Sequence, residues 1–263
     1  MKLCANLSML FTEHALLDRF DAARDCDFSA VEIQFPYQQT LSELVRKKRE
    51  NELEIALINL PAGDLMEGGF GLASHPKRRD AFFRAIEQAA QYAEALDVGR
   101  VNVLAGRTDP SFAEEHHRDV FLENLNDCAN QLKTLGIKTV FEAINTVDMP
   151  DFLISRTDQM LQVISDLNHS HVAMQYDLYH MTKMQQPIKD QLPDIIQHIG
   201  HLQFADTPNR QQPGTGDLPF EELMSQLQGL NYQQWVGAEY HPSDSTADSL
   251  EWKNWYQENI LGH

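Results

Sequence analysis

The stretch "EEHHRDVFLENLNDCANQLKTLGIKTVFEAIN" (residues 114–145) combines a helical pattern with a strand pattern. Its first part has the apolar spacing of an amphipathic helix, and Gly136 is a residue that commonly ends a helix. The part that follows, residues 138–144, is mostly apolar, which is typical of a parallel strand covered on both faces. The stretch therefore predicts one helix–strand unit of an α/β protein.

Comparable units recur along the whole chain. Strands are predicted at residues 3–8, 30–35, 54–60, 100–106, 138–144, 171–177, 200–206 and 235–240. Helices are predicted at residues 12–25, 75–97, 114–136, 155–168, 188–199, 219–230 and 246–261, with Pro193 interrupting the fifth. Eight strands that alternate with helices in this way are typical of a (β/α)₈ TIM barrel.

A doubly wound sheet is the alternative fold, and the first strand argues against it. No GxGxxG follows "LCANLS", so the phosphate-binding turn of that fold is missing. No Pro/Ser-rich or low-complexity linker marks a boundary, and a barrel of this kind commonly occupies about 250 residues. We therefore expect one catalytic domain over residues 1–263.

Composition restricts the classes of function. The formal charge of −18 disfavours nucleic-acid binding, because such a surface repels phosphates. No window is apolar enough to span a membrane, and the N-terminus lacks a secretory signal pattern, so we expect a cytoplasmic protein. Three widely separated cysteines, at positions 4, 26 and 128, predict free thiols and no disulfide.

The predicted strands carry polar residues near their C-terminal ends. Strand 138–144 contains Glu142, and a buried carboxylate there needs a partner or a metal. The next three strands carry Asp177, Gln203 and Glu239 at the same end. The C-terminal ends of barrel strands surround the active site, so these four oxygen-bearing side chains should meet there.

Three carboxylates and an amide oxygen, with no predicted cysteine ligand, form a hard-ligand set. Such a set binds a divalent ion, with Mg²⁺ expected and Mn²⁺ as the alternative. The ion would also neutralise like charges confined to a small buried site.

Other residues are expected around the same rim. His180 could hydrogen-bond a substrate oxygen, and Arg210 could bind a substrate carboxylate, although each could equally be structural. "FPY" (35–37) and "NLPAGD" (59–64) are expected to form pocket walls. "PGTGD" is expected to be a tight turn in which Asp217 caps the next helix. His116 and His117 are expected on the surface.

The motifs "ANLSMLF", "NLPAGD", "FEAIN", "QYDLYHM", "GHLQFADTPNRQQPGTGD" and "WVGAEY" resemble the hydroxypyruvate isomerase family of the xylose-isomerase-like TIM barrels. The resemblance extends over nearly the whole chain. It implies a divalent ion at Glu142, Asp177, Gln203 and Glu239, with Glu142 and Glu239 as the proton-transferring pair. Gln203 is informative, because related sugar epimerases usually have a histidine at that ligand position.

The implied reaction interconverts hydroxypyruvate and tartronate semialdehyde, which requires moving a proton between two adjacent carbons through an enediolate. Alternatives within the superfamily are a 2-oxo-tetronate isomerase and a ketose 3-epimerase. A phosphodiesterase of the endonuclease IV type is disfavoured by the negative charge and by Gln203. A non-catalytic sugar-acid binding protein is disfavoured by the complete carboxylate set. The late aromatics Trp252, Trp255 and Tyr256 could support a homo-oligomer contact or pack the last helix.

Overall fold

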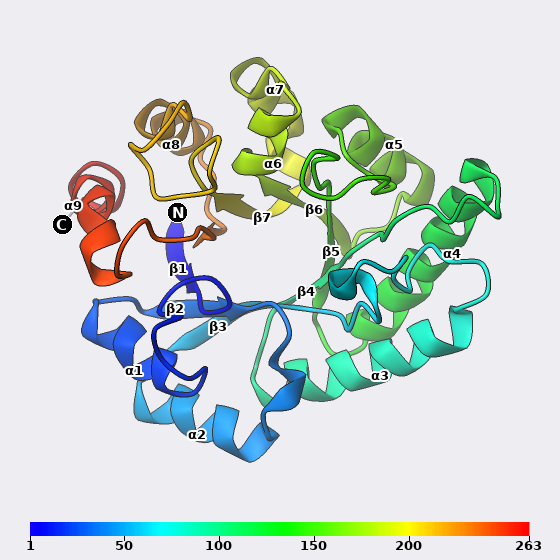
Figure 1. The fold of residues 1–263 in the computed structure, drawn as a ribbon, viewed down its shortest axis with the longest axis horizontal. Helices are drawn as coiled ribbons and strands as arrows, with labels where there is room; N and C mark the ends of the chain where they lie inside the picture. Colours follow the sequence, from blue (N-terminus) through cyan, green and yellow to red (C-terminus); the bar gives the residue numbers. More distant parts are fainter. Residues whose placement is uncertain (263) are drawn as a thin grey trace.

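Within residues 1–262, which the computed structural model describes, eight parallel strands close into a barrel by pairing of β1 with β8 (Figure 1). The strands are β1 (Lys2–Asn6), β2 (Ala30–Ile33), β3 (Glu54–Asn59), β4 (Arg100–Val103), β5 (Lys138–Glu142), β6 (Val172–Asp177), β7 (Ile199–Phe204) and β8 (Trp235–Ala238). The predicted (β/α)₈ TIM barrel is confirmed.

Helices surround the barrel in Figure 1. They are α1 (Asp18–Asp25), α2 (Leu41–Glu50), α3 (Arg79–Ala95), α4 (Glu114–Lys133), α5 (Thr157–Leu167), α6 (Leu178–Lys183), α7 (Ile188–Ile195), α8 (Phe220–Gly229) and α9 (Glu251–Tyr256). Short 3₁₀ turns lie at Pro36–Gln38, Leu65–Glu67, Ile196–His198 and Ala247–Leu250, and a π turn at Gln257–Leu261. No helix within residues 1–262 is long and apolar enough to cross a membrane.

All eight predicted strands are present, but seven of them end earlier than their apolar pattern does. Strand 100–106, for example, ends as β4 at Val103, although Leu104 and Ala105 remain buried. Apolar side chains continue into the loops because these loops also cover the core. Burial therefore extends beyond the hydrogen-bonded ladder, and the pattern alone overestimates strand length.

Helix α2 was not predicted, although the sequence contains a signal for it. The helix is mostly charged, and Leu44 is its buried apolar residue. Its start is a capping box, in which Thr40 accepts from the backbone N–H of Glu43 and Glu43 accepts from that of Thr40. The S/T-x-x-E pattern of "TLSE" is the local signature of this cap. Helix α6, also not predicted, is too short to show a periodic pattern.

Pro193 does not break α7. A proline at this position removes the helical hydrogen bond to the carbonyl of Lys189. The side chain of Gln226 donates to that carbonyl instead, at 2.8 Å. The helix then tightens into a 3₁₀ turn at Ile196–His198 before β7 begins.

His117, predicted on the surface, is fully buried, whereas His116 is exposed as expected. The prediction for His117 is wrong because the loops before α3 and α4 fold over this face of α4. The Nδ1–H of His117 donates to the carbonyl of Ser74 at 2.9 Å, and its Nε2 accepts from the backbone N–H of Asp109 at 3.0 Å. The imidazole of His117 is thus hydrogen-bonded to both the loop before α3 and the loop before α4.

Asp217 does not cap α8, because the helix begins three residues later, at Phe220, and no side chain among residues 1–262 caps it. The turn that contains Gly214 and Gly216 is instead organised by Asp206. The buried carboxylate of Asp206 accepts four backbone N–H bonds, each of 2.8–2.9 Å, from Thr207, Gly214, Gly216 and Leu218. The carboxylate therefore shapes the loop that follows β7.

The C-terminal aromatics pack on the barrel. Trp252 and Tyr256 are buried, and the ring of Trp252 lies 5.0 Å from that of Phe204 in β7. These two residues are therefore not available for a contact between copies of the chain. Trp255 is half-buried and lies 6.0 Å from the ring of Phe220.

Candidate active site

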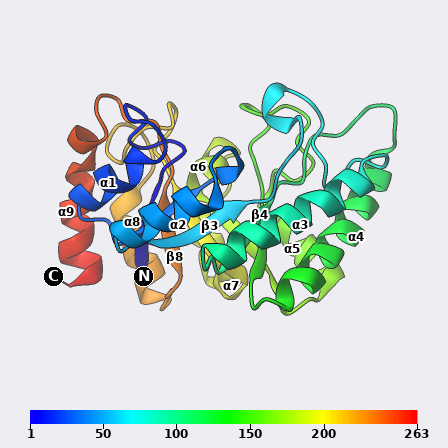
Figure 2. The same ribbon diagram turned by 90° about the horizontal axis from the view of Figure 1, so that it is seen from below.

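Long loops gather at one end of the barrel, along the upper edge of Figure 2. Glu142 ends β5, Asp177 ends β6, Gln203 is in β7, and Glu239 follows β8 directly. All four side chains are buried, with at most 4% of the residue exposed. Asp177 and Gln203 are register partners, so the parallel ladder alone places them side by side.

Two side chains link these residues into one cluster. The Nε2 of Gln175 donates to Glu142 at 2.9 Å and to the Oε1 of Gln203 at 2.6 Å. Arg210 pairs with Glu239 and lies 3.5 Å from the Oδ2 of Asp177. The structure therefore brings together all four residues predicted as metal ligands.

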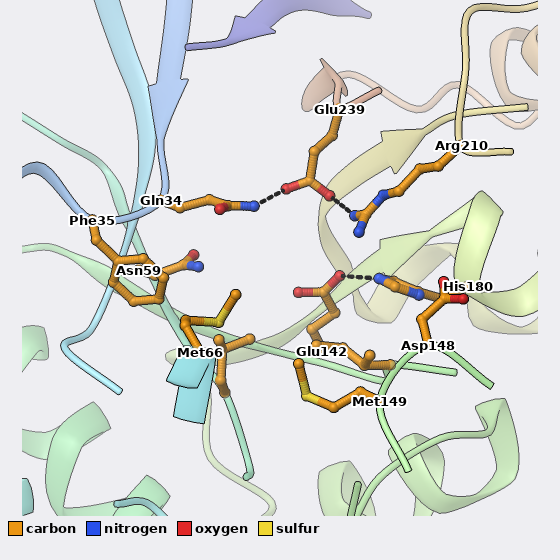
Figure 3. Close-up of a pocket in the computed structure, with 12 residues that line it drawn as sticks. Gln34, Phe35, Asn59, Met66, Glu142, Asp148, Met149, His180, Arg210 and Glu239 are labelled. Carbon is orange, nitrogen blue, oxygen red and sulfur yellow. Dashed lines mark hydrogen bonds and ion pairs between the residues drawn. The ribbon is translucent and has the colours of Figure 1, made fainter. Parts of the chain in front are cut away.

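His180 and Arg210, predicted as substrate-binding residues, lie in the same cluster. Both line a cavity of about 210 Å³ together with Glu142 and Glu239, whose carboxylates approach from opposite sides in Figure 3. The guanidinium of Arg210 stacks on Tyr179, 5.0 Å from the ring centre. Arg210 has φ +58°, an uncommon conformation for a residue with a side chain.

The hydrogen bonds of His180 identify which ring nitrogen carries the proton. Its Nδ1 lies 2.7 Å from the Nδ2 of Asn145, and the Oδ1 of Asn145 is already held by the N–H groups of Val147 and Asp148. Nδ2 is therefore the donor, and His180 Nδ1 accepts. Burial lowers the pKa of His180 well below its usual range, so Nε2 carries the single ring proton. His180 can thus donate a hydrogen bond into the cavity.

The carboxylates of Glu142, Asp177 and Glu239 lie close together in a buried site, where their negative charges repel one another. Burial raises the pKa of Glu142 well above its usual range, and the charges of Glu239 and Asp177 raise it further. Burial also raises the pKa of Asp177 to about 7, although Arg210 opposes this shift. The pKa of Glu239 is raised by burial against the same opposing charge. A bound cation would relieve this repulsion.

The donor set fits a divalent ion. The Oδ2 of Asp177 is buried and accepts no hydrogen bond from any residue in 1–262. Ligand atoms of Glu142, Asp177 and His180 lie within 4.8 Å of one another. The proton on His180 Nε2 favours the neighbouring oxygens over this nitrogen as ligands, as expected for Mg²⁺ or Mn²⁺.

The walls of the cavity combine apolar and polar side chains. Phe35 and Asn59 line it, as predicted from "FPY" and "NLPAGD". The other wall residues are Gln34, Met66, Leu104, Ile144, Asp148 and Met149. The cavity therefore offers a substrate apolar surface from Phe35, Leu104 and Ile144 as well as polar partners outside the carboxylates.

Beneath the cluster lies a buried pair that the sequence analysis did not single out. Glu32 in β2 is fully buried, and its Oε2 lies 2.6 Å from the Nε2 of His201 in β7. Burial disfavours ionisation of Glu32, but its interactions with His201, Gln203 and Asn6 outweigh it, so its pKa lies below the usual range. The signal was an acid inside the apolar run "AVEIQF", the same pattern that marked Glu142.

Cys4 joins this pair, and ligand atoms of Cys4, Glu32 and His201 lie within 4.8 Å of one another. The direct 2.6 Å hydrogen bond between His201 and Glu32 leaves no room for an ion between those two atoms. The group is therefore a hydrogen-bonded cluster.

The chain matches the family model of the xylose isomerase-like TIM barrels over residues 20–258. It is 38% identical to the hydroxypyruvate isomerase of Escherichia coli (strain K12), over 98% of this chain and 100% of that protein. The chain belongs to the hydroxypyruvate isomerase family of these barrels. The family inferred from the sequence motifs is confirmed.

Two further proteins are similar to this chain. The 2-oxo-tetronate isomerase of Cupriavidus necator is 36% identical over 95% of this chain and 96% of that protein. A Brucella melitensis crystal structure described as an AP endonuclease of family 2 is 31% identical, with a TM-score of 0.94 over 97% of this chain and 98% of that one. The two sequence relatives are named isomerases, in agreement with the expected enzyme class.

Proposed function

We propose that the chain is a metal-dependent isomerase that interconverts hydroxypyruvate and tartronate semialdehyde (2-hydroxy-3-oxopropanoate). One observation carries the proposal: two buried glutamates face each other across a small cavity that also contains an arginine (Figure 3). The E. coli relative named hydroxypyruvate isomerase supports the same substrate.

Glu142, Asp177, Gln203 and Glu239 would hold the ion, with Mg²⁺ expected and Mn²⁺ as the alternative. The bound ion would supply Lewis-acid stabilisation of the oxyanion that develops on the substrate. The chain's own contribution is to hold the ligands rigidly at the ends of four neighbouring strands.

Glu142 and Glu239 are suited to proton transfer because they lie on opposite sides of the cavity (Figure 3). One carboxylate removes a proton from C3 of hydroxypyruvate, and a carboxylate delivers a proton to C2, while the hydroxyl proton passes from O3 to O2. The product is tartronate semialdehyde with no gain or loss of electrons. The Nε2–H of His180 would donate to a substrate oxygen.

Arg210 is the proposed partner of the substrate carboxylate. Replacing it with methionine removes charge-assisted hydrogen bonds, each of which contributes about 1.5–3 kcal/mol. We expect Arg210→Met to lower kcat/KM for hydroxypyruvate by about 10–150-fold, mainly through KM. Steady-state kinetics at saturating Mg²⁺ measures this, and an unchanged KM would remove Arg210 from the substrate site.

A 2-oxo-tetronate isomerase is the second candidate, because the Cupriavidus necator relative carries that name at 36% identity. The two substrates differ by one carbon, so the cavity walls decide between them. A ketose 3-epimerase is less well supported, because the two sequence relatives described above are named hydroxypyruvate isomerase and 2-oxo-tetronate isomerase. A nuclease is disfavoured by the charge of −18.

A substrate panel tests the proposal. Metal-loaded enzyme is incubated with hydroxypyruvate, a 2-oxo-tetronate and free ketoses, and the products are followed by proton NMR. We expect the highest kcat/KM for hydroxypyruvate, with tartronate semialdehyde as product. Turnover of 2-oxo-tetronate without turnover of hydroxypyruvate would replace the first candidate with the second.

We also propose a cytoplasmic location. Cys4, Cys26 and Cys128 are free, and two of them are buried, which suits a reducing compartment.

A further inference from the structure

Glu32 lies at the centre of a hydrogen-bond network beneath the proposed metal site. Its Oε2 accepts from His201 Nε2 at 2.6 Å and from Cys4 Sγ at 3.4 Å. Its Oε1 accepts from Gln203 Nε2 at 2.6 Å and from Asn6 Nδ2 at 2.9 Å. These four contacts suit an ionised carboxylate, which can only accept hydrogen bonds.

The contact with Gln203 determines which end of its amide faces the metal site. A glutamine side chain has one donating end and one accepting end. Because Nε2 is held by Glu32, Oε1 must point away from Glu32, toward Gln175 and the ligand cluster. A flipped amide would turn the NH₂ group toward the ion and place its oxygen against the carboxylate of Glu32.

The contact with Asn6 links Glu32 to one of the proposed catalytic carboxylates. Asn6 Oδ1 accepts from the backbone N–H of Ser8 at 2.9 Å, so its Nδ2 is the end that donates. This Nδ2 bonds to Glu32 and also to Glu239 Oε1, both at 2.9 Å. Glu32 therefore contacts one metal ligand directly and a second through a single amide.

The space that the Glu32 carboxylate occupies inside the barrel depends on Gly237. Gly237 in β8 is the register partner of both Gln203 and Cys4. A Cβ added at Gly237 would lie 2.5 Å from Glu32 Oε2, closer than van der Waals contact allows. A glycine at this position is therefore needed if Glu32 is to occupy the centre of the barrel.

We propose that Glu32 is a positioning residue that orients the amides of Gln203 and Asn6, so that Gln203 Oε1 and the Glu239 carboxylate face the metal ion. The inference rests on the proposed metal site. It differs from a purely structural role of the Glu32–His201 pair, because it predicts a loss of metal affinity beyond any loss of stability. Partners that orient metal ligands typically change affinity by about 10–100-fold.

The test is Glu32→Gln, which replaces the acceptor-only group with one that presents an NH₂ end to these donors. Protein stripped with EDTA is titrated with Mn²⁺, and free Mn²⁺ is measured by electron paramagnetic resonance. We expect the Kd for Mn²⁺ to rise by about 10–100-fold, and kcat to recover in part when Mn²⁺ is raised by a similar factor. A shift of less than about threefold in folded protein would overturn the proposal.

Two control variants distinguish a positioning role of Glu32 from a general loss of protein stability. Glu54→Gln makes the same chemical change at an exposed residue of β3, far from the cavity, and should leave Kd and activity unchanged. His117→Gln perturbs a buried histidine of the outer layer, and should lower the melting temperature without changing the Kd. An equal loss of affinity in His117→Gln would favour a structural role for Glu32.

If Glu32→Gln does not fold, Glu32→Asp provides the same test, because it keeps the charge but is one methylene too short to hold both His201 and Gln203. A rise in the Kd for Mn²⁺ of less than about threefold in folded Glu32→Asp would likewise overturn the proposal. Absence of Mn²⁺ binding by the unsubstituted protein would instead contradict the proposed metal site, so the two failures are distinguishable.

Discussion

Replacing Glu142 or Glu239 with glutamine is expected to lower kcat by about 10²–10⁴-fold, the usual contribution of a positioned proton-transfer group. An amide of nearly the same shape cannot accept the substrate proton. Glu142 accepts hydrogen bonds from Asn102 at 3.2 Å and Gln175 at 2.9 Å, and a glutamine oxygen can accept both. Kinetics with excess metal, together with circular dichroism of each variant, measures the loss in folded protein.

The stability of Glu142→Gln provides a second readout. Burial and two neighbouring carboxylates make ionised Glu142 costly when no cation is bound. The metal-free variant should therefore melt higher than the metal-free parent at pH 8, by on the order of a few degrees. Glu115→Gln, an exposed residue of α4, serves as the control and should change neither quantity. Full activity in Glu142→Gln and Glu239→Gln would remove both residues from the proposed mechanism.

Removing the metal is expected to abolish turnover and to lower the melting temperature. An ion at about 100 times its Kd stabilises the folded state by about 2.7 kcal/mol. For a chain of this size that corresponds to a shift of about 5–10 °C. Scanning calorimetry of EDTA-stripped and Mg²⁺- or Mn²⁺-reloaded protein measures the shift, and activity should return on reloading. Undiminished turnover after complete removal of metal would contradict the proposed site.

The size of this thermal shift should depend on pH. Burial raises the pKa of Asp177 to about 7, and those of Glu142 and Glu239 are also raised. A raised carboxyl pKa contributes stability that is complete below the unfolded pKa of about 4 and is lost as pH rises through the folded pKa. The metal-free protein should therefore lose stability between about pH 5 and pH 8.

Metal binds the ionised carboxylates, so its stabilising effect should increase over the same interval. The melting temperature is measured with and without metal at pH 5.5 and at pH 8, and the metal-induced difference is compared between the two pH values. Titration of the acidic surface changes both melting temperatures at a given pH equally, so it does not affect this difference. A larger difference at pH 5.5 would contradict the assignment of these carboxylates as ligands.

The sequence alone determined the barrel and the identity of its four rim residues. Both follow from local patterns: an apolar strand ends in a polar side chain, and parallel strands place their C-terminal ends at one face. Glu142, Asp177, Gln203 and Glu239 could therefore be found without knowing how the strands close. The capping box at Thr40 was also a local signal, and α2 could have been predicted from it.

The tertiary structure alone decided which side chains contact one another inside the barrel. Glu32 and His201 are 169 residues apart, and their contact exists only because the barrel brings β2 and β7 to a common axis. His117 is buried because the loops before α3 and α4 cover this face of α4, although its helical position indicates the surface. Arg210 reaches Glu239 and Asp177 only through the path of a loop shaped by Asp206. Periodicity records whether a position faces the core, but long-range packing determines its partners, and in this chain those partners orient the proposed ligands.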